Sequence, residues 1–205
     1  MRSRLVPAFA LVLLLSARAT VRAHSLITYS VPPDSWSSAA GIPDPDVSRV
    51  IYRELATSAT RTWIRFRGVK GQRISFNLGV PVLGRLSAFR PLAALVGPGL
   101  PLDPGTPLER PPGSGAVVLR PQYPPETPPP VFHESFTGTD SWMLLEDTVV
   151  LPEDGEYYLV AFAPDSWNAP AKLWLAIGTK ERFTLREIFE LGKVKRFVRE
   201  FHETR

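Results

Sequence analysis

The sequence predicts an all-β fold, a β-sandwich or jelly roll of about eight or nine strands, with one amphipathic helix at its C-terminal end. Three observations predict it. Apolar and polar residues alternate over short runs, turns rich in proline or glycine separate these runs, and the 205 residues include 22 prolines, which disfavour long helices. Many short strands separated by turns are typical of sandwiches, whereas a βαβ fold would alternate strands with helices.

The first 23 residues have the organisation of a secretory signal. Two arginines precede an apolar run at 5–15, and small residues then form two cleavage sites, after Ala19 and after Ala23. The apolar run is shorter than the roughly 20 residues of a membrane-spanning helix. We therefore expect 1–23 to be a cleavable signal peptide and the mature protein to be secreted or extracytoplasmic. The alternative is an uncleaved anchor.

The basic excess of the chain belongs to this N-terminal segment. The full sequence has 24 Lys and Arg against 20 Asp and Glu, and 1–23 holds four arginines and no acid, which leaves 20 basic against 20 acidic residues. A chain with this balance gives no support for nucleic-acid binding. The absence of cysteine excludes thiol catalysis and cysteine zinc sites. The 182 residues after the signal (205 minus 23) suffice for one domain with its own core.

The remaining chain divides into an arm, a sandwich and a helix. Residues 24–47 are rich in turn signals and predict an irregular N-terminal arm, and 48–183 predict the sandwich domain. In 74–78, for example, three apolar side chains alternate with serine and asparagine, which places one face on a core. The glycine in 69–72 predicts a hairpin turn. Strands are expected at 48–55, 63–67, 74–78, 92–96, 116–119, 142–150, 156–162 and 172–178.

One long segment interrupts this series. Proline and glycine dominate residues 99–130, apart from 116–119, and the run 92–96 before it is continuously apolar. A short apolar run of this kind predicts a strand buried on both faces. We expect 99–130 to be a surface excursion around one short strand, and excursions of this length within a domain are usually functional or mobile.

The chain ends in one predicted helix, 184–205. Thr184, with Glu187 three residues later, forms a capping box, and apolar residues then recur at helical spacing. Gly192 predicts a kink or break. Basic residues occupy the other face, so the segment 185–203 has two interpretations. Either its apolar stripe packs on the sandwich, or it lies on an anionic membrane surface.

Three segments resemble strands of pre-peptidase C-terminal-type sandwiches. Residues 62–66 with 71–78 are similar to the opening strands of that family, 151–160 to its late hairpin, and 172–177 to its closing strand. The resemblance extends over 62–178 with gaps and implies an accessory β-sandwich of secreted enzymes. Members of that family sometimes contain calcium or bind glycans. In this chain no catalytic domain precedes the sandwich, so an accessory role to an enzyme in the same chain is not expected.

A second resemblance concerns the start of the mature chain. The segment 136–139 with Trp142, together with an arm that begins at Ala23 and His24, looks like uncharacterised secreted microbial proteins with a histidine after the signal peptide. This resemblance implies a fold and no activity.

His24 is the sharpest chemical feature. Cleavage after Ala23 would make it the first residue, which offers an amine and an imidazole nitrogen, and a second imidazole from His133 would complete a copper site. Copper-binding sandwiches with an N-terminal histidine, among them oxidative polysaccharide enzymes and periplasmic copper carriers, are an analogue. Cleavage after Ala19 instead makes His24 internal and leaves His133 an ordinary surface residue.

Carboxylates near turns are candidate calcium ligands, because calcium prefers oxygen. No spacing matches an EF-hand loop. The alternative is that these side chains form turns and solvated caps. The candidates are Asp44, Asp46, Glu134, Asp140, Glu146 and Asp147.

Four residues are candidate contacts for an organic ligand. Trp36 and Trp167 each follow a Pro-Asp-Ser sequence in a loop, where an exposed indole can stack on a sugar ring. Glu134 and Trp142 belong to the segment 132–142 beside the excursion. The alternative for both loop tryptophans is that they close the open ends of the sandwich.

The sequence favours a secreted non-catalytic domain with a binding or structural role. It contains no Gly-x-Ser-x-Gly elbow, and the glycines at 97–99 are not followed by the helix that a phosphate cradle requires. A glycan or a protein at the cell envelope is the expected partner. The alternatives are a copper protein that uses His24 with His133, and a domain that associates with a membrane surface through 185–203.

Overall fold

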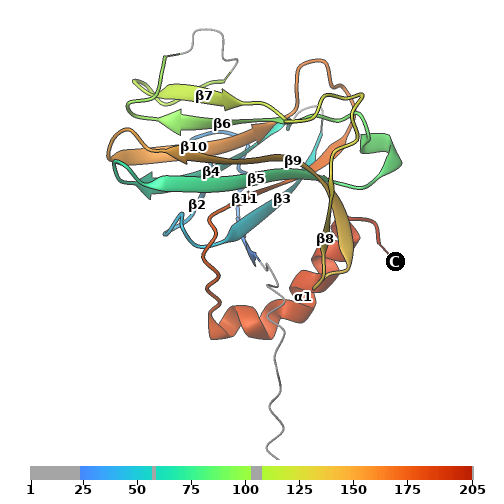
Figure 1. Cartoon of the computed structure of the whole chain (residues 1–205). Helices are drawn as coiled ribbons and strands as arrows, with labels where there is room; N and C mark the ends of the chain where they lie inside the picture. Colours follow the sequence, from blue (N-terminus) through green and yellow to red (C-terminus); the bar gives the residue numbers. More distant parts are fainter. Residues whose placement is uncertain (1–23, 57–58, 103–107, 205) are drawn as a thin grey trace, which may run out of the picture.

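Two β-sheets pack face to face, and one helix lies against the outside of one of them (Figure 1). The computed structural model describes residues 24–56, 59–102 and 108–204, so the expected signal peptide at 1–23 lies outside the described residues. The strands are β1 (Ser25–Leu26), β2 (Ala40–Gly41), β3 (Arg49–Leu55), β4 (Arg61–Gly68), β5 (Arg73–Pro81), β6 (Leu92–Gly97), β7 (Gly115–Leu119), β8 (Val131–Glu134), β9 (Thr139–Val150), β10 (Gly155–Phe162) and β11 (Ala171–Ile177). A 3-10 turn, η1 (Gly84–Leu86), and the helix α1 (Leu185–Phe201) complete the fold.

The strand order confirms the predicted all-β sandwich with a C-terminal helix. One sheet has the order β1-β3-β11-β5-β9-β8 and the other β2-β4-β10-β6-β7. Within the described residues there are eleven strands, where the sequence predicted eight or nine. Three strands, β1, β2 and β8, have no counterpart among the predicted ranges. Strands β1 and β2 have two residues each, so no alternation is visible in them. Both belong to the segment 24–47, which adds a parallel strand to the edge of each sheet.

Alternate side chains of the strands form the core between the sheets. In β5, Ile74, Phe76 and Leu78 are buried in it, while Ser75 and Asn77 point to the outside. Burial of each such large apolar side chain stabilises the fold by about 1.5–3 kcal/mol. The period-two alternation in the sequence therefore predicts the inner face correctly.

A second apolar cluster covers the outer face of the five-stranded sheet. Ala94 and Val96 of β6 belong to this outer cluster, whereas Ala93 and Leu95 belong to the core. Strand β6 is thus buried on both faces, as its continuous apolar run predicts. Trp36 packs on the outer cluster, so part of the N-terminal arm covers this sheet.

A buried arginine binds the part of the excursion that follows β7 to the sandwich. The guanidinium of Arg90 donates to the carbonyl oxygens of Ser87 (2.8 Å), Tyr123 (3.0 Å) and Thr127 (3.2 Å). Burial lowers the pKa of Arg90, and these carbonyls replace the water that the buried charge would otherwise bind. The segment after β7 is therefore held in place by hydrogen bonds to one side chain.

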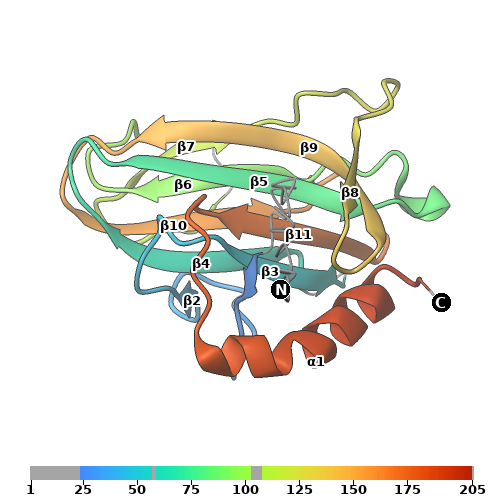
Figure 2. The same cartoon turned by 60° about the horizontal axis from the view of Figure 1, so that its bottom comes forward.

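The helix α1 packs on the outer face of the six-stranded sheet (Figures 1 and 2). Its capping box forms as predicted, with the Thr184 side chain accepting from the backbone N–H of Glu187. The ring of Tyr52 in β3 makes an edge contact with Phe201, with centroids 5.0 Å apart. The helix continues through Gly192, so the expected break is absent, because one glycine costs a helix only about 1 kcal/mol. Figures 1 and 2 show that α1 changes direction part-way along its length. In the described residues, no helix is long and apolar enough to cross a membrane.

His202 joins the end of α1 to the sheet. Its Nδ1 lies 2.8 Å from the carbonyl oxygen of Val198, so Nδ1 donates, and its Nε2 accepts from the hydroxyl of Ser141 (2.9 Å). The same hydroxyl oxygen accepts the indole N–H of Trp174 (2.9 Å). Burial lowers the pKa of His202, and the charge of Lys172 lowers it further. This chain of hydrogen bonds therefore uses a neutral imidazole.

Trp174 occupies space that a glycine leaves open. Its indole lies over Gly79 of β5, where a Cβ atom would overlap the six-membered ring. The two strands pair at this position, Trp174 with Gly79. Only glycine leaves room at position 79 for the indole. The indole N–H in turn positions the Ser141 hydroxyl by a hydrogen bond.

We predict that the stabilising contribution of His202 depends on pH. The folded chain binds the imidazole proton less readily than the unfolded chain, so this contribution is present above the ordinary pKa of 6.5 and is lost as the pH falls below it toward the lowered native value. His202→Gln should lower the free energy of unfolding by about 1–3 kcal/mol near neutral pH. Urea denaturation at a series of pH values should show this difference shrinking on acidification. A difference that stays constant would contradict the proposed neutral imidazole.

We predict that Gly79→Ala destabilises the sandwich. The added methyl group forces the Trp174 indole to move, which should lower the free energy of unfolding by about 1–3 kcal/mol in urea denaturation. Gly84→Ala is the matched control, since no atom lies within 4 Å of a Cβ there, and it should change stability by less than about 0.5 kcal/mol. Equal effects of the two substitutions would be inconsistent with the indole contact.

Candidate ligand-binding groove

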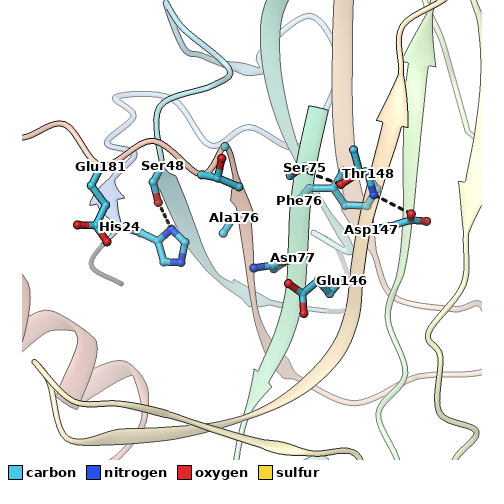
Figure 3. Close-up of a pocket in the computed structure, with 12 residues that line it drawn as sticks. His24, Ser48, Ser75, Phe76, Asn77, Glu146, Asp147, Thr148, Ala176 and Glu181 are labelled. Carbon is cyan, nitrogen blue, oxygen red and sulfur yellow. Dashed lines mark hydrogen bonds between the residues drawn. The ribbon is translucent and has the colours of Figure 1, made fainter. Parts of the chain in front are cut away.

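His24 immediately precedes β1 and lies on the outer face of the six-stranded sheet. Strand β1 pairs with β3 in parallel, and the Ser25 amide donates to the carbonyl oxygen of Ser48 (3.1 Å). A hydrogen bond joins the His24 Nδ1 to the Ser48 hydroxyl (Figure 3). The imidazole is therefore held over the sheet from its edge.

Three hollows of about 160, 240 and 40 Å³ adjoin His24, and all three are lined by its side chain. We call them together the His24 groove. Figure 3 shows the side chains of the 160 Å³ hollow, which come from β5, β9 and β11 and from the segment that leads to α1. The residues used below are Ser75, Asn77, Glu146, Thr148, Ala176 and Glu181.

The groove exists because the outward side chains at its floor are small. Ser75 and Asn77 of β5 lie beside Ala176 of β11, and the Ser75 hydroxyl lies 2.9 Å from that of Thr148 on β9. Trp174, two residues before Ala176, fills the same face farther along. The large side chains and α1 thus cover one part of the outer face and leave the His24 groove beside it.

The lining of the groove is negatively charged. The 160 Å³ hollow has carboxylates from Glu146 and Glu181 and no lysine or arginine among its lining residues, whereas the Asp147 carboxylate points away from it (Figure 3). Lys180, next to Glu181, instead binds Asp46 (2.7 Å), and this hydrogen bond lowers the pKa of the Asp46 carboxyl. Acidic walls without a facing basic side chain favour a cation over an anion.

The β8–β9 hairpin separates the two histidines of the expected copper site. Phe132 and Glu134 line the His24 groove, and alternation along β8 turns the residue between them, His133, to the opposite face. There the His133 Nδ1 lies 2.7 Å from a carboxylate oxygen of Asp140. The structure therefore does not bring His133 into the groove with His24.

Glu134 has a local structural role in the same hairpin. Its carboxylate accepts from the backbone N–H groups of Phe136 (2.9 Å) and Thr137 (2.7 Å) and from the Thr137 hydroxyl. The side chain lines the 40 Å³ hollow but uses its oxygens to close the turn.

The three tryptophans expected to contact a ligand lie apart from one another. Trp36 packs on the outer cluster of the five-stranded sheet, and Trp142 packs against the core. Trp167 lies against Phe89, with ring centroids 4.8 Å apart, and lines a separate hollow of about 300 Å³ at the end of the sandwich. Trp167 thus packs at the end of the sandwich and helps to close it. It does not line the His24 groove.

The carboxylates expected to bind calcium are dispersed. Asp46 binds Gln72 (2.9 Å) and Lys180, and Asp44 accepts from the backbone N–H of Asp46 (3.0 Å). Asp147 accepts from the amide of the next residue (2.7 Å). Within the described residues, no group of three or more His, Asp or Glu side chains is arranged to hold a metal ion.

Several groove residues were missed in the sequence. Asn77 and Ala176 are outward positions of alternating strands, so the pattern predicts only solvent around them. Glu181 follows the last strand and has no motif. The one available signal was the small size of Ser75 and Asn77 in β5 and of Ala176 in β11, which distinguishes a hollow from a face filled by large side chains.

Comparisons with known proteins give similar structures only. No family model matches the sequence, and no curated protein matches it. The pre-peptidase C-terminal domain of a collagenase from Bacillus anthracis has a TM-score of 0.36 at 10% identity, covering 67% of this chain and 91% of that domain. The surface-associated copper-binding protein CorA of Methylomicrobium album BG8 has a TM-score of 0.35 at 12% identity, covering 69% of this chain and 98% of CorA. PliG, a periplasmic inhibitor of g-type lysozyme from Aeromonas hydrophila, has a TM-score of 0.33 at 11% identity, covering 77% of this chain and all of PliG.

The sandwich family that the sequence resembles is thus among the similar structures. Similarity at these TM-scores supports no inference about a ligand or an activity, and the assignment of the fold rests on the strands of this chain.

We predict that Trp167 contributes to stability. Trp167→Ala removes a ring that packs on Phe89 and should lower the free energy of unfolding by about 2–4 kcal/mol. Trp167→Phe keeps a ring contact and should recover most of the loss. Urea denaturation measures both variants. If the alanine variant unfolds like the unaltered protein but loses retention on a polysaccharide column, the indole is a sugar platform instead.

Proposed function

We propose that this protein is a secreted, non-catalytic β-sandwich domain that binds a cationic ligand in the His24 groove. The observation that supports the ligand class is the lining of the groove, which combines one imidazole with carboxylates and contains no lysine or arginine. The organisation of residues 1–23 supports export. The glycan or protein partner expected at the cell envelope would then present a positively charged group to this groove.

Copper(II) is the metal ion that suits the groove best. Imidazole nitrogen is a preferred ligand of copper, and Glu146 and Glu181 line the same hollow as His24. Because no three such side chains of the described residues are grouped to hold a metal ion, a site here would combine His24 with one of these carboxylates. Cleavage after Ala23 would add the terminal amine of His24 as a second nitrogen. Calcium is the alternative, because it would use the carboxylates and not the imidazole.

The two candidate copper sites differ in which substitutions should reduce Cu(II) binding. A site within the groove uses His24 with Glu146 or Glu181, and a site built from both histidines uses His24 with His133. Titration calorimetry of the chain from residue 24 to 205, which contains every described strand and helix, distinguishes them. The groove site predicts that His24→Ala abolishes Cu(II) binding, whereas Glu146→Gln with Glu181→Gln weakens it about tenfold.

His133→Ala is the matched control for this titration, since His133 is exposed and outside the groove. Unchanged Cu(II) binding by this variant supports the groove site, and loss of binding supports the pair of histidines. Binding of Ca(II) that is insensitive to His24→Ala would assign the carboxylates to calcium. The proposed function is wrong if neither ion binds and if His24→Ala and the unaltered chain also have the same affinity for cationic peptides.

A further inference from the structure

The outward face of α1 bears large apolar side chains at its N-terminal half. Leu185 is 76% exposed, Ile188 is 49% exposed and Phe189 is 87% exposed. At 100° per residue, Leu185 and Phe189 lie on the same side of the helix, and Ile188 lies at its margin. We call these three residues the α1 apolar patch.

The patch is not needed to pack α1 on the sandwich. A different set of side chains, Leu191, Val194 and Val198, faces the sheet and borders the 40 Å³ hollow. These residues lie on the side of the helix opposite to Leu185 and Phe189. The helix is therefore apolar on two sides, and one of them is unpartnered in the described structure.

Basic side chains follow the patch along the same outward face. Lys193 and Arg196 are exposed and lie within two turns of Phe189. Lys195 is also exposed, at the margin where its ammonium lies over the ring of Phe136 (5.7 Å). Glu200 is the acidic residue on this face, and it lies in the last turn, farthest from the patch.

The position of α1 leaves this face accessible. Figures 1 and 2 both show the helix at one side of the molecule, outside the two sheets. Its N-terminal half, which bears the patch, lies below the strands in both views. A flat surface can therefore approach the patch without meeting the sandwich.

We infer that the outward face of α1 docks on an anionic membrane surface. Apolar side chains inserted at the level of the acyl chains, with lysine and arginine at the level of the lipid phosphates, are the arrangement by which interfacial helices bind. A second copy of the chain is the less suitable occupant. Three side chains on one helix form a small patch, whereas a stable dimer buries about 800 Å² per partner.

The test is co-sedimentation of residues 24–205 with vesicles of phosphatidylcholine alone and of phosphatidylcholine with about 30% phosphatidylglycerol. We expect binding to the anionic vesicles and little binding to the neutral ones. Leu185→Ala with Phe189→Ala should weaken binding at least about tenfold while keeping helix propensity. Lys193→Glu with Arg196→Glu should weaken it similarly, and raised salt should release the unaltered protein.

Val69→Ala with Leu102→Ala is the matched control, because both side chains are exposed (58% and 74%) and lie away from α1. The control should bind vesicles like the unaltered chain. Absence of binding by the unaltered chain, or equal binding by the patch variant, would overturn the inference. A third outcome is that the unaltered chain does not bind vesicles but self-associates in sedimentation velocity, and that Phe189→Ala abolishes this self-association. That outcome would assign the patch to contact with a second copy of the chain. Cu(II) binding in the groove is unaffected by any of these outcomes, so the two proposals fail separately.

Discussion

The indole of Trp174 links three parts of this molecule. It lies in the space left by Gly79, donates to Ser141, and through that hydroxyl reaches His202 at the end of α1. A side chain of any size at position 79 would displace it. Because these hydrogen bonds join buried atoms, loss of one partner leaves a buried polar group without a hydrogen bond. The resulting loss of free energy destabilises the packing of the helix as well as the sheet. The attachment of α1 and the extent of the outer face that stays open both depend on this contact.

The predictable part of the fold is the part with local periodicity. Positions 74–78 show in the sequence which side chains enter the core, because the period of a strand is two, and the continuous apolar run at 92–96 predicts burial on both faces. The capping box at Thr184 is likewise local. Strands β1 and β2 are too short for a pattern and form only because the arm meets the edges of both sheets. At Gly192 the helix continues without the expected break, since the cost of one glycine in a helix is small.

The candidate site is less predictable, because its geometry comes from distant segments. His24 was identified from its position after a predicted cleavage site, but its hydrogen bond to Ser48 and its place in one hollow with Glu146 and Glu181 follow from strand order. The position of His133 shows the limit of reasoning from residue types. Its neighbours in sequence reach the groove, and the single-residue alternation of β8 turns His133 away from it.

The wall that α1 shares with the His24 groove has a thermodynamic consequence. Val194 and Val198 face the same 40 Å³ hollow as His24, so the position of the helix and the shape of the hollow are not independent. Any ligand that prefers one placement of the helix changes the affinity of the groove, and by linkage a groove ligand changes the affinity of the helix surface by the same factor. In this fold the same helix forms one wall of the groove and bears the exposed apolar side chains, so the two surfaces share one structural element.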